Sequence, residues 1–301
     1  MTHYREIANL RRCNSDNVVR LRDVAFTRAD NGRHNFVLVF DYFEHDLLGL
    51  LKHRVKLGLG QVRSVFRQLA TGLAHLHSHG ILHRDLKSAN VLVNNEGKVA
   101  LADLGLSAKK PDGVQGAFLK PVCTLLYQSP EQLFRSPRGY NEKADIWSLG
   151  CVLYELLTGC VLFYAAKSKE QLVDMVVRGF GNEEFDGWED GRLTEVFRQH
   201  QHRLKQNNRI WQALTRTIED PSALSLLESL CRLNPDKRPS AEAVLRHPFF
   251  TEAPEGQDVE QLLQKVPQNR KGVPHLRPAR GGREEGRGAS DGRAPKGAPR
   301  C

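Results

Sequence analysis

Long apolar runs are absent from this sequence of 301 residues. A helix that crosses a membrane needs about 20 mostly apolar residues. The nearest candidate, residues 146–164, is interrupted by Ser148, Glu155 and Thr158. We therefore expect no membrane span and no membrane contact, and we interpret this segment as a buried helix. The opening Met-Thr-His-Tyr-Arg-Glu also lacks the apolar core of a secretory signal.

Cysteine is scarce, and its spacing excludes two common uses. The six cysteines stand at positions 13, 123, 151, 160, 231 and 301. They include no close pair typical of a zinc site and no disulfide framework. We therefore expect a reducing compartment inside the cell, nuclear or cytoplasmic.

The net charge of +9 is not spread evenly along the chain. Residues 265–301 contain ten Lys or Arg and three acidic residues, a net +7, which leaves about +2 for residues 1–264. Residues 251–301 are rich in Gly, Pro and Arg, so we predict a disordered basic tail. The tail could contact nucleic acid or act as a nuclear address, but a merely solubilising role is favoured because no aromatics are interleaved for base stacking.

Two polar motifs carry the chemistry. Residues 83–90 read His-Arg-Asp-Leu-Lys-Ser-Ala-Asn, and Asp103-Leu104-Gly105 follows. Asp85 is a candidate base, Lys87 a compact cation beside a phosphoryl group, and Asn90 and Asp103 are oxygen ligands suited to Mg²⁺. Asp-Leu-Gly alone would be read as an ordinary turn. The ordered combination favours transfer of the γ-phosphate of ATP.

Apolar spacing predicts an α+β fold. A helix is expected over residues 3–12 and strands over 18–26 and 35–40, joined by a turn at Asp30-Asn31-Gly32. Apolar residues from Val62 to Leu76 recur at helical spacing, and helices dominate after residue 142. Short strands are expected at residues 81–82, 91–93 and 99–101.

Several separated segments resemble the eukaryotic protein kinases, and within them the transcription-associated branch of the cyclin-dependent group. The segments are Tyr4–Ile7, Phe40–Leu47, Asp145–Cys151, Leu233–Pro239 and His247–Phe250, in addition to the two motifs above. The resemblance spans residues 4–250 and implies a kinase domain over 1–250. It would comprise a truncated small β lobe (1–42) and a mainly helical large lobe (43–250). It also implies ATP and Mg²⁺ as cofactors, a protein Ser/Thr substrate, a cyclin contact through Tyr4–Ile7, and the nucleus as the favoured location.

The resemblance assigns further roles residue by residue. Thr124 would hydrogen-bond near Asp85, and Glu131 would form a buried ion pair with Arg238. Read alone, Phe40 is more often a core aromatic and Asp46 a helix cap. The implied nucleotide-binding residues are Glu6 (partner of the ATP-positioning lysine), Phe40 (gatekeeper), Asp41 and Phe43 (adenine edge), Asp46 (ribose) and Leu92 (adenine floor).

The sequence also departs from the family pattern. No Gly-x-Gly-x-x-Gly precedes Glu6, and no lysine precedes Lys52, so we expect weak positioning of the nucleotide phosphates. Leu119 stands where the group places its phosphorylated threonine, and Ala108 replaces an arginine that would hold the phosphate. Loop phosphorylation is therefore not expected to activate this chain.

Two interpretations stay open. The first is a cyclin-dependent-type Ser/Thr kinase whose given sequence lacks its first strands and which has low activity alone. The second is a catalytically impaired kinase-like scaffold that binds proteins. Retention of Asp85, Lys87, Asn90 and Asp103 favours the first.

Overall fold

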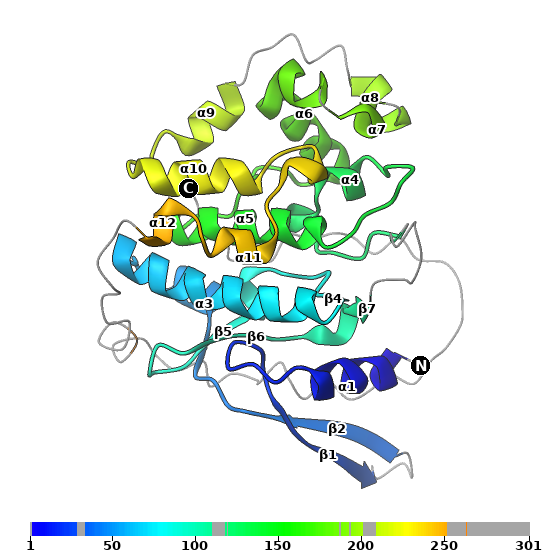
Figure 1. Ribbon diagram of the computed structural model, residues 1–301, viewed down its shortest axis with the longest axis vertical. Helices are drawn as coiled ribbons and strands as arrows, with labels where there is room; N and C mark the ends of the chain where they lie inside the picture. The colour runs from blue at the N-terminus through cyan, green and yellow to red at the C-terminus, as the bar shows by residue number, and fades with distance from the viewer. Residues whose placement is uncertain are drawn as a thin grey trace.

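The computed structural model describes residues 2–28, 34–109, 118, 120–186, 188–192, 194–200, 209–251 and 263. One helix and a hairpin lie at one end, and the rest is mainly helical with a few short strands (Figure 1). Helix α1 (Thr2–Arg12) lies beside the antiparallel pair β1 (Leu21–Arg28) and β2 (His34–Phe40). This arrangement confirms the predicted first helix and the two predicted strands. The predicted turn between those strands, residues 30–32, lies outside the described residues.

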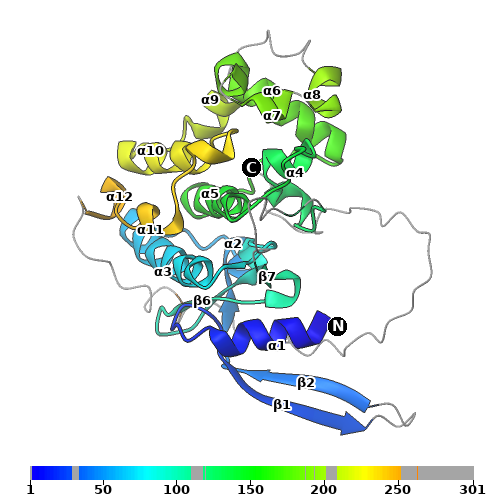
Figure 2. The same ribbon diagram turned by 45° about the vertical axis from the view of Figure 1, so that its right-hand side comes forward.

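The hairpin is a separate two-stranded sheet. Its register runs from Leu21 opposite Phe40 to Arg28 opposite His34, with an irregularity between Leu21 and Asp23. It projects from the body of the molecule in both ribbon views (Figure 2). Two-stranded sheets are marginally stable by themselves, because few residues pack against each strand.

Short strands frame the two polar motifs. Strands β3 (His45–Asp46), β5 (Val91–Val93) and β6 (Val99–Leu101) form an antiparallel sheet in the order β3-β5-β6. Strand β4 (Ile81–Leu82) pairs with β7 (Ala108–Lys109). The strands predicted from apolar triplets and pairs are therefore confirmed. Gly97 has φ 75°, which a left-handed turn between β5 and β6 requires and which glycine adopts readily.

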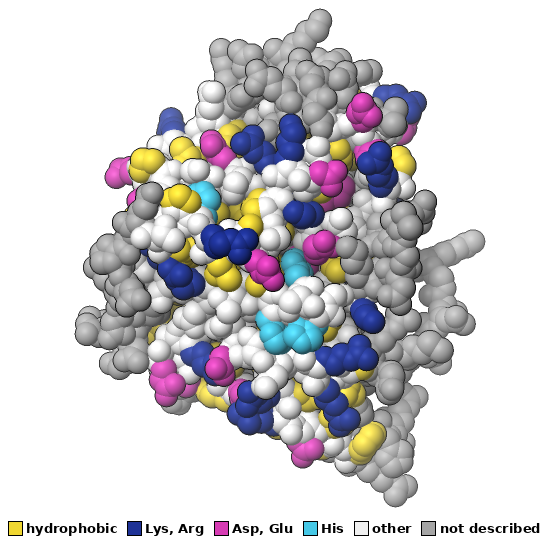
Figure 3. Space-filling model, viewed as in Figure 1, with side chains coloured by type: hydrophobic (Ala, Val, Ile, Leu, Met, Phe, Trp, Pro, Cys, Tyr) yellow, Lys and Arg dark blue, Asp and Glu magenta, His cyan; other side chains and the backbone are white. Residues whose placement is uncertain are grey.

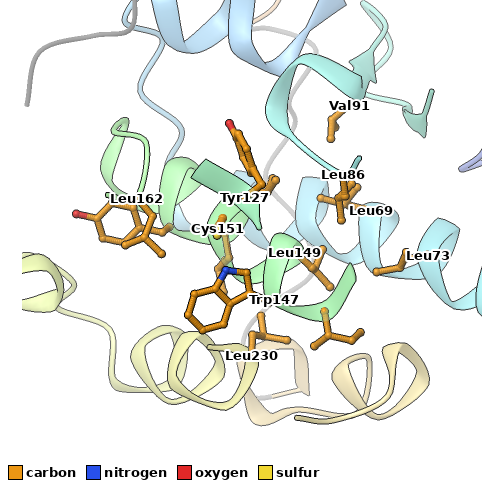
Figure 4. Close-up of a cluster of buried hydrophobic side chains, with 14 of the residues drawn as sticks. Leu69, Leu73, Leu86, Val91, Tyr127, Trp147, Leu149, Cys151, Leu162 and Leu230 are labelled. Carbon is orange, nitrogen blue, oxygen red and sulfur yellow. The ribbon is translucent and has the colours of Figure 1, made fainter. Parts of the chain in front are cut away.

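The large lobe is built around helix α5 (Lys143–Thr158), in which every residue from Ala144 to Leu156 is buried. A mainly apolar helix that is buried on all sides belongs in a core. The buried-helix interpretation is thus confirmed for residues 146–156, whereas the helix ends at Thr158, short of the predicted end at residue 164. Figure 4 shows Trp147 and Leu149 of α5 among side chains from α3 (Leu59–Ser78) and α10 (Pro221–Leu230). A methyl group at Gly150 would lie 2.7 Å from the Cys231 sulfur, so this helix crossing needs glycine.

The remaining helices complete the large lobe. Those flanking the core are α2 (Leu47–Lys52), α4 (Pro130–Leu133), α6 (Lys169–Asp186), α7 (Glu189–Arg192), α8 (Glu195–His200), α9 (Arg209–Thr215), α11 (Ala241–Val244) and α12 (Pro248–Thr251). Short 3₁₀ turns η1 (Ser88–Asn90), η2 (Leu104–Leu106), η3 (Leu125–Tyr127) and η5 (Pro235–Lys237) lie in the loops.

The predicted buried ion pair is present. Arg238 donates to both carboxylate oxygens of Glu131, at 2.9 and 2.8 Å, and both side chains are almost fully buried. Its other donors reach the carbonyls of Arg232, Lys143 and Leu233 at 2.7, 2.8 and 3.0 Å. The pair fixes α4 to the segment before α11.

The predicted basic tail, 251–301, lies outside the described residues except for Thr251 and Leu263. Leu263 is fully buried and belongs to the hydrophobic core. Within the described ranges, no helix is long and apolar enough to cross a membrane.

Candidate active site

Asp85 is the centre of a compact polar cluster. Its Oδ1 accepts hydrogen bonds from the Thr124 backbone N–H at 2.9 Å and from Thr124 Oγ1 at 2.7 Å. Its Oδ2 accepts from Lys87 Nζ at 2.6 Å, and Lys87 also donates to Thr124 Oγ1 at 2.9 Å. The structure thus brings together three residues that the sequence assigned to catalysis. The carboxylate is held in one orientation by charge-assisted bonds.

The catalytic loop keeps its shape through the buried carboxylate of Asp145. Asp145 accepts from the backbone N–H groups of His83 and Arg84, each at 2.9 Å. Arg84 has φ 66°, a left-handed conformation that costs free energy in a non-glycine residue. The two bonds to Asp145 stabilise this conformation and so direct the following Asp85 side chain.

Asp145 is kept ionised by its neighbours. Burial alone would raise its pKa, but a hydrogen bond and positive charge from His77, together with smaller contributions that include the hydrogen bond from the Arg84 N–H, outweigh burial, and the pKa is lowered. His77 Nε2 lies 2.9 Å from Asp145 Oδ2. Sequence reasoning missed both roles. The signal available in the sequence was the carboxylate of Asp145 at the start of a mainly apolar helix.

His83 is fully buried and links the loop to the strand that leads to Asp103. Its Nε2 lies 3.0 Å from the Ala102 carbonyl, and its Nδ1 lies 3.3 Å from the Asp85 N–H. These partners require the tautomer with hydrogen on Nε2. His83 therefore has a structural role beneath Asp85 and is not itself a base.

Asn90 and Asp103 offer the predicted oxygen ligands. Asn90 Nδ2 donates to the Asp85 carbonyl at 2.9 Å, which leaves the amide oxygen as the group for a cation. The Ala102 N–H donates to the Asn90 carbonyl at 2.9 Å, so the two ligand-bearing segments are joined. Asp103 has φ 60° and ψ 65°, and its Oδ1 accepts from the Gly105 N–H at 3.4 Å.

This donor set fits Mg²⁺. Magnesium is usually held by one or two protein oxygens together with nucleotide phosphates. Within the described residues, no group of three or more His, Cys, Asp or Glu is arranged to hold a metal alone. A methyl group at Gly105 would come within 3.1 Å of Asp103 Oδ1, so glycine leaves room for that carboxylate.

Glu6 of α1 faces the same turn. A methyl group at Gly105 would lie 3.8 Å from both of its carboxylate oxygens. Burial, and then the charge of Asp103, raise the pKa of Glu6. No Lys or Arg in the described part of the chain forms an ion pair with it. Asn9 of the same helix donates to Ser107 Oγ at 3.1 Å, so α1 is attached to the segment that follows the Asp103 turn.

The other predicted nucleotide-binding residues lie in β2, in the segment that follows it, and in strands β3 and β5. Phe40 ends β2 opposite Leu21 and packs against the core, as Phe43 does. Asp41 bonds Arg22 through its side chain, and its N–H donates to the Arg20 carbonyl at 3.4 Å, which leaves its backbone carbonyl for adenine. Leu92 lies in β5 between Asp46 and Ala100.

Asp46 has a clear structural role. Its Oδ1 accepts from the Gly49 N–H at 2.8 Å and caps α2. This is the ordinary role of an Asp before a helix. The ribose contact stays a prediction.

The segment between Asp103 and Glu131, here called the activation segment, is described in part. Leu119, predicted in place of a phosphorylated threonine, lies outside the described residues. Ala108 lies in β7, and Gln128 Nε2 donates to the Cys123 carbonyl at 2.8 Å. Leu104 is buried in the core, so an apolar residue packs at this position.

Comparisons with known proteins agree with this geometry. Residues 1–250 match the family described as protein kinase domain. Cyclin-dependent kinase 12 of Caenorhabditis elegans is 38% identical over 261 residues, which cover 83% of this chain and 35% of that protein. Cyclin-dependent kinase 9 of Bos taurus is 32% identical over 270 residues, covering 87% of this chain and 72% of that protein.

A solved structure has the same fold. The yeast RNA Pol II CTD kinase CTDK-1 complex contains a chain that superposes with a TM-score of 0.75 at 26% identity. The match covers 86% of this chain and 83% of that chain. The chain therefore belongs to the protein kinase family, in its cyclin-dependent group. It spans about a third of the length of the Caenorhabditis elegans relative, which is 35% covered.

Proposed function

We propose that this chain carries the base and metal-ligand half of a Ser/Thr kinase site. In that site the γ-phosphate of ATP is transferred to a protein hydroxyl. The observation that carries the proposal is the Asp85–Lys87–Thr124 cluster beside Asn90 and Asp103. A structural loop has no need for a cation, a carboxylate and a hydroxyl held in mutual contact.

Each residue then has a defined task. Asp85 accepts a hydrogen bond from the substrate hydroxyl and directs its oxygen at the phosphorus. Lys87 supplies positive charge as charge develops on the transferring group, and Thr124 keeps both side chains in place. Asn90 and Asp103 would hold Mg²⁺, which when bound neutralises the phosphate oxygens.

Positioning of the nucleotide phosphates is the weak part of the proposed site. Within these 301 residues no lysine precedes Glu6, and Glu6 has no cationic partner among the described residues. Transfer depends on orientation, and a misplacement of about 1 Å can cost about 100-fold in rate. We therefore propose that these residues alone transfer phosphate slowly.

Partners follow from the same assignment. Helix α1, which contains Tyr4–Ile7, is the proposed cyclin contact, and protein Ser/Thr is the proposed substrate. A nuclear location is proposed on the likeness to cyclin-dependent kinases 12 and 9. On the face in Figure 3, basic and acidic side chains are interspersed, so that face does not support nucleic-acid contact.

The test compares the chain with Asp85→Asn and Asp103→Asn. We expect slow, Mg²⁺-dependent transfer to a peptide from the RNA polymerase II C-terminal domain, the substrate named for the yeast structure. Asp85→Asn should abolish transfer and leave Mg²⁺-dependent ATP binding within about twofold, because Asp85 acts on the hydroxyl. Asp103→Asn should weaken that binding at least about tenfold.

The scaffold interpretation predicts a different result. A folded chain that shows no Mg²⁺-dependent ATP binding in calorimetry would contradict the kinase proposal. Equal transfer by the chain and by Asp85→Asn would contradict the role of Asp85.

A further inference from the structure

Phe118 is held against Tyr140 ahead of α5. The Phe118 N–H donates to the Tyr140 carbonyl at 2.8 Å, and the Tyr140 N–H donates back to the Phe118 carbonyl at 2.9 Å. Their rings lie 5.6 Å apart. The Tyr140 hydroxyl also donates to the Lys120 carbonyl at 3.0 Å. Because Tyr140 is buried, these contacts fix the backbone on both sides of position 119 to the large lobe.

The Phe118 ring covers the guanidinium of Arg84, whose central carbon lies 4.7 Å from the ring centroid. Arg84 Nε donates to the Leu106 carbonyl at 2.6 Å. No acidic side chain in the described ranges forms an ion pair with Arg84. Burial raises the pKa of Tyr140, and the positive charge of Arg84 and a hydrogen bond from its side chain offset part of that rise. The guanidinium is thus held by the Phe118 ring, the Leu106 carbonyl and the Tyr140 hydroxyl.

These contacts join three parts of the site. Arg84 immediately precedes Asp85 and is itself in a left-handed conformation. Leu106 ends the turn that begins at Asp103, and its neighbour Ser107 is bonded to Asn9 of α1. A guanidinium over a ring gains electrostatic attraction from the negative face of the ring. Displacing Phe118 would release Arg84 and loosen both the catalytic loop and the Asp103 turn.

We propose that Phe118 is a positioning residue that acts through Arg84 and keeps the catalytic loop and the Asp103 turn in register without a phosphate group. The expected effect of Phe118 on phosphate transfer rests on the proposed kinase function. Its expected effect on the order of the loop and the turn does not depend on that function.

The test is hydrogen–deuterium exchange on the full chain, which requires no enzymatic activity. Phe118→Leu keeps the backbone bonds to Tyr140 but removes the aromatic face. We expect the amides of Arg84 and Ser107 to exchange at least about threefold faster, with the amides of α5 unchanged. Phe118→Tyr should restore wild-type exchange because it keeps the ring.

The matched control is Tyr164→Leu, which removes the ring from a remote pair with Lys167 at 5.8 Å. It should leave the exchange rates of the Arg84 and Ser107 amides unchanged. Unchanged exchange in Phe118→Leu, or an equal increase in Tyr164→Leu, would overturn the proposal.

Where the chain transfers phosphate, Phe118→Leu should lower kcat about tenfold with KM for ATP unchanged. Failure of transfer in the unmutated chain would contradict the proposed function and leave the exchange result decisive for Phe118.

Discussion

The floor of the site (residues 83–90 and 102–105) and the small-lobe part (α1, β1 and β2) differ in how their charged groups are partnered. Asp85 receives three hydrogen bonds from Lys87 and Thr124. Glu6 of the small-lobe part faces Asp103 instead of a cation, and its pKa is raised. The floor is ordered by the core of the large lobe, whereas the small-lobe part is a helix and a two-stranded sheet. Under the proposed function, half of the site is pre-organised by the large lobe alone.

The largest expected effect concerns the buried ion pair of Glu131 and Arg238 in the large lobe. Arg238→Leu should lower the free energy of unfolding by about 3–5 kcal/mol, because it leaves Glu131 charged and buried without a partner. Urea denaturation followed by circular dichroism measures this. The matched control is Asp41→Ala in the exposed pair with Arg22, which should leave the unfolding curve nearly unchanged. Similar losses in both variants would remove the contrast between the two regions.

A second prediction uses Glu155, which is fully buried in α5. Burial raises its pKa to about 7 from an ordinary 4.5, and the nearby hydroxyls of Tyr127 and Ser88 offset part of the rise. Those hydroxyls lie 3.1 Å apart and bond each other, while neither Glu155 oxygen accepts a bond of normal geometry. The carboxyl group of the folded chain is therefore favoured in its protonated form below about pH 7.

The sign of the pH effect follows from this raised pKa. Between pH 4.5 and about 7 the folded chain keeps a proton that the unfolded chain loses. The free energy of unfolding should therefore fall as pH rises through this window, by roughly 3 kcal/mol. Glu155→Gln should remove that part of the pH dependence and be more stable than the unmutated chain at pH 8. Parallel stability curves for the two proteins from pH 5 to 8 would contradict the prediction.

Much of this organisation could be predicted from local patterns. The His83–Asn90 motif, the Asp103 turn and the apolar periodicity of α3 each lie within a short stretch of sequence. The buried pair of Glu131 and Arg238 came from family resemblance and was confirmed. The support from His77 and Asp145 was not predicted, because it depends on packing α3 against α5. The contact of Arg84 with Phe118 likewise joins segments whose distance is set by the tertiary fold.

The smallest expected effect concerns Glu6 of helix α1, on the small-lobe side of the comparison. Because burial and Asp103 raise the pKa of Glu6, its ionisation destabilises the folded chain as pH rises above the ordinary value. Glu6→Gln should therefore stabilise the chain at pH 7, by less than about 1 kcal/mol since the side chain is partly exposed. Thermal unfolding at pH 5 and pH 7 measures it, with a larger gain expected at pH 7. A loss of stability at pH 7 would indicate that the Glu6 carboxylate already has a favourable partner.

The most direct test of the central claim is phosphotransfer by a chimera. Strands bearing a Gly-rich loop and a lysine from a cyclin-dependent relative would be joined ahead of Glu6, and transfer would be compared with that of residues 1–301 alone. If the floor is already assembled and only the positioning of the nucleotide phosphates is weak, the chimera should transfer at least about 100-fold faster, and Asp85→Asn should abolish the gain. A folded chimera that binds ATP but transfers no faster than the chain would contradict a pre-organised floor.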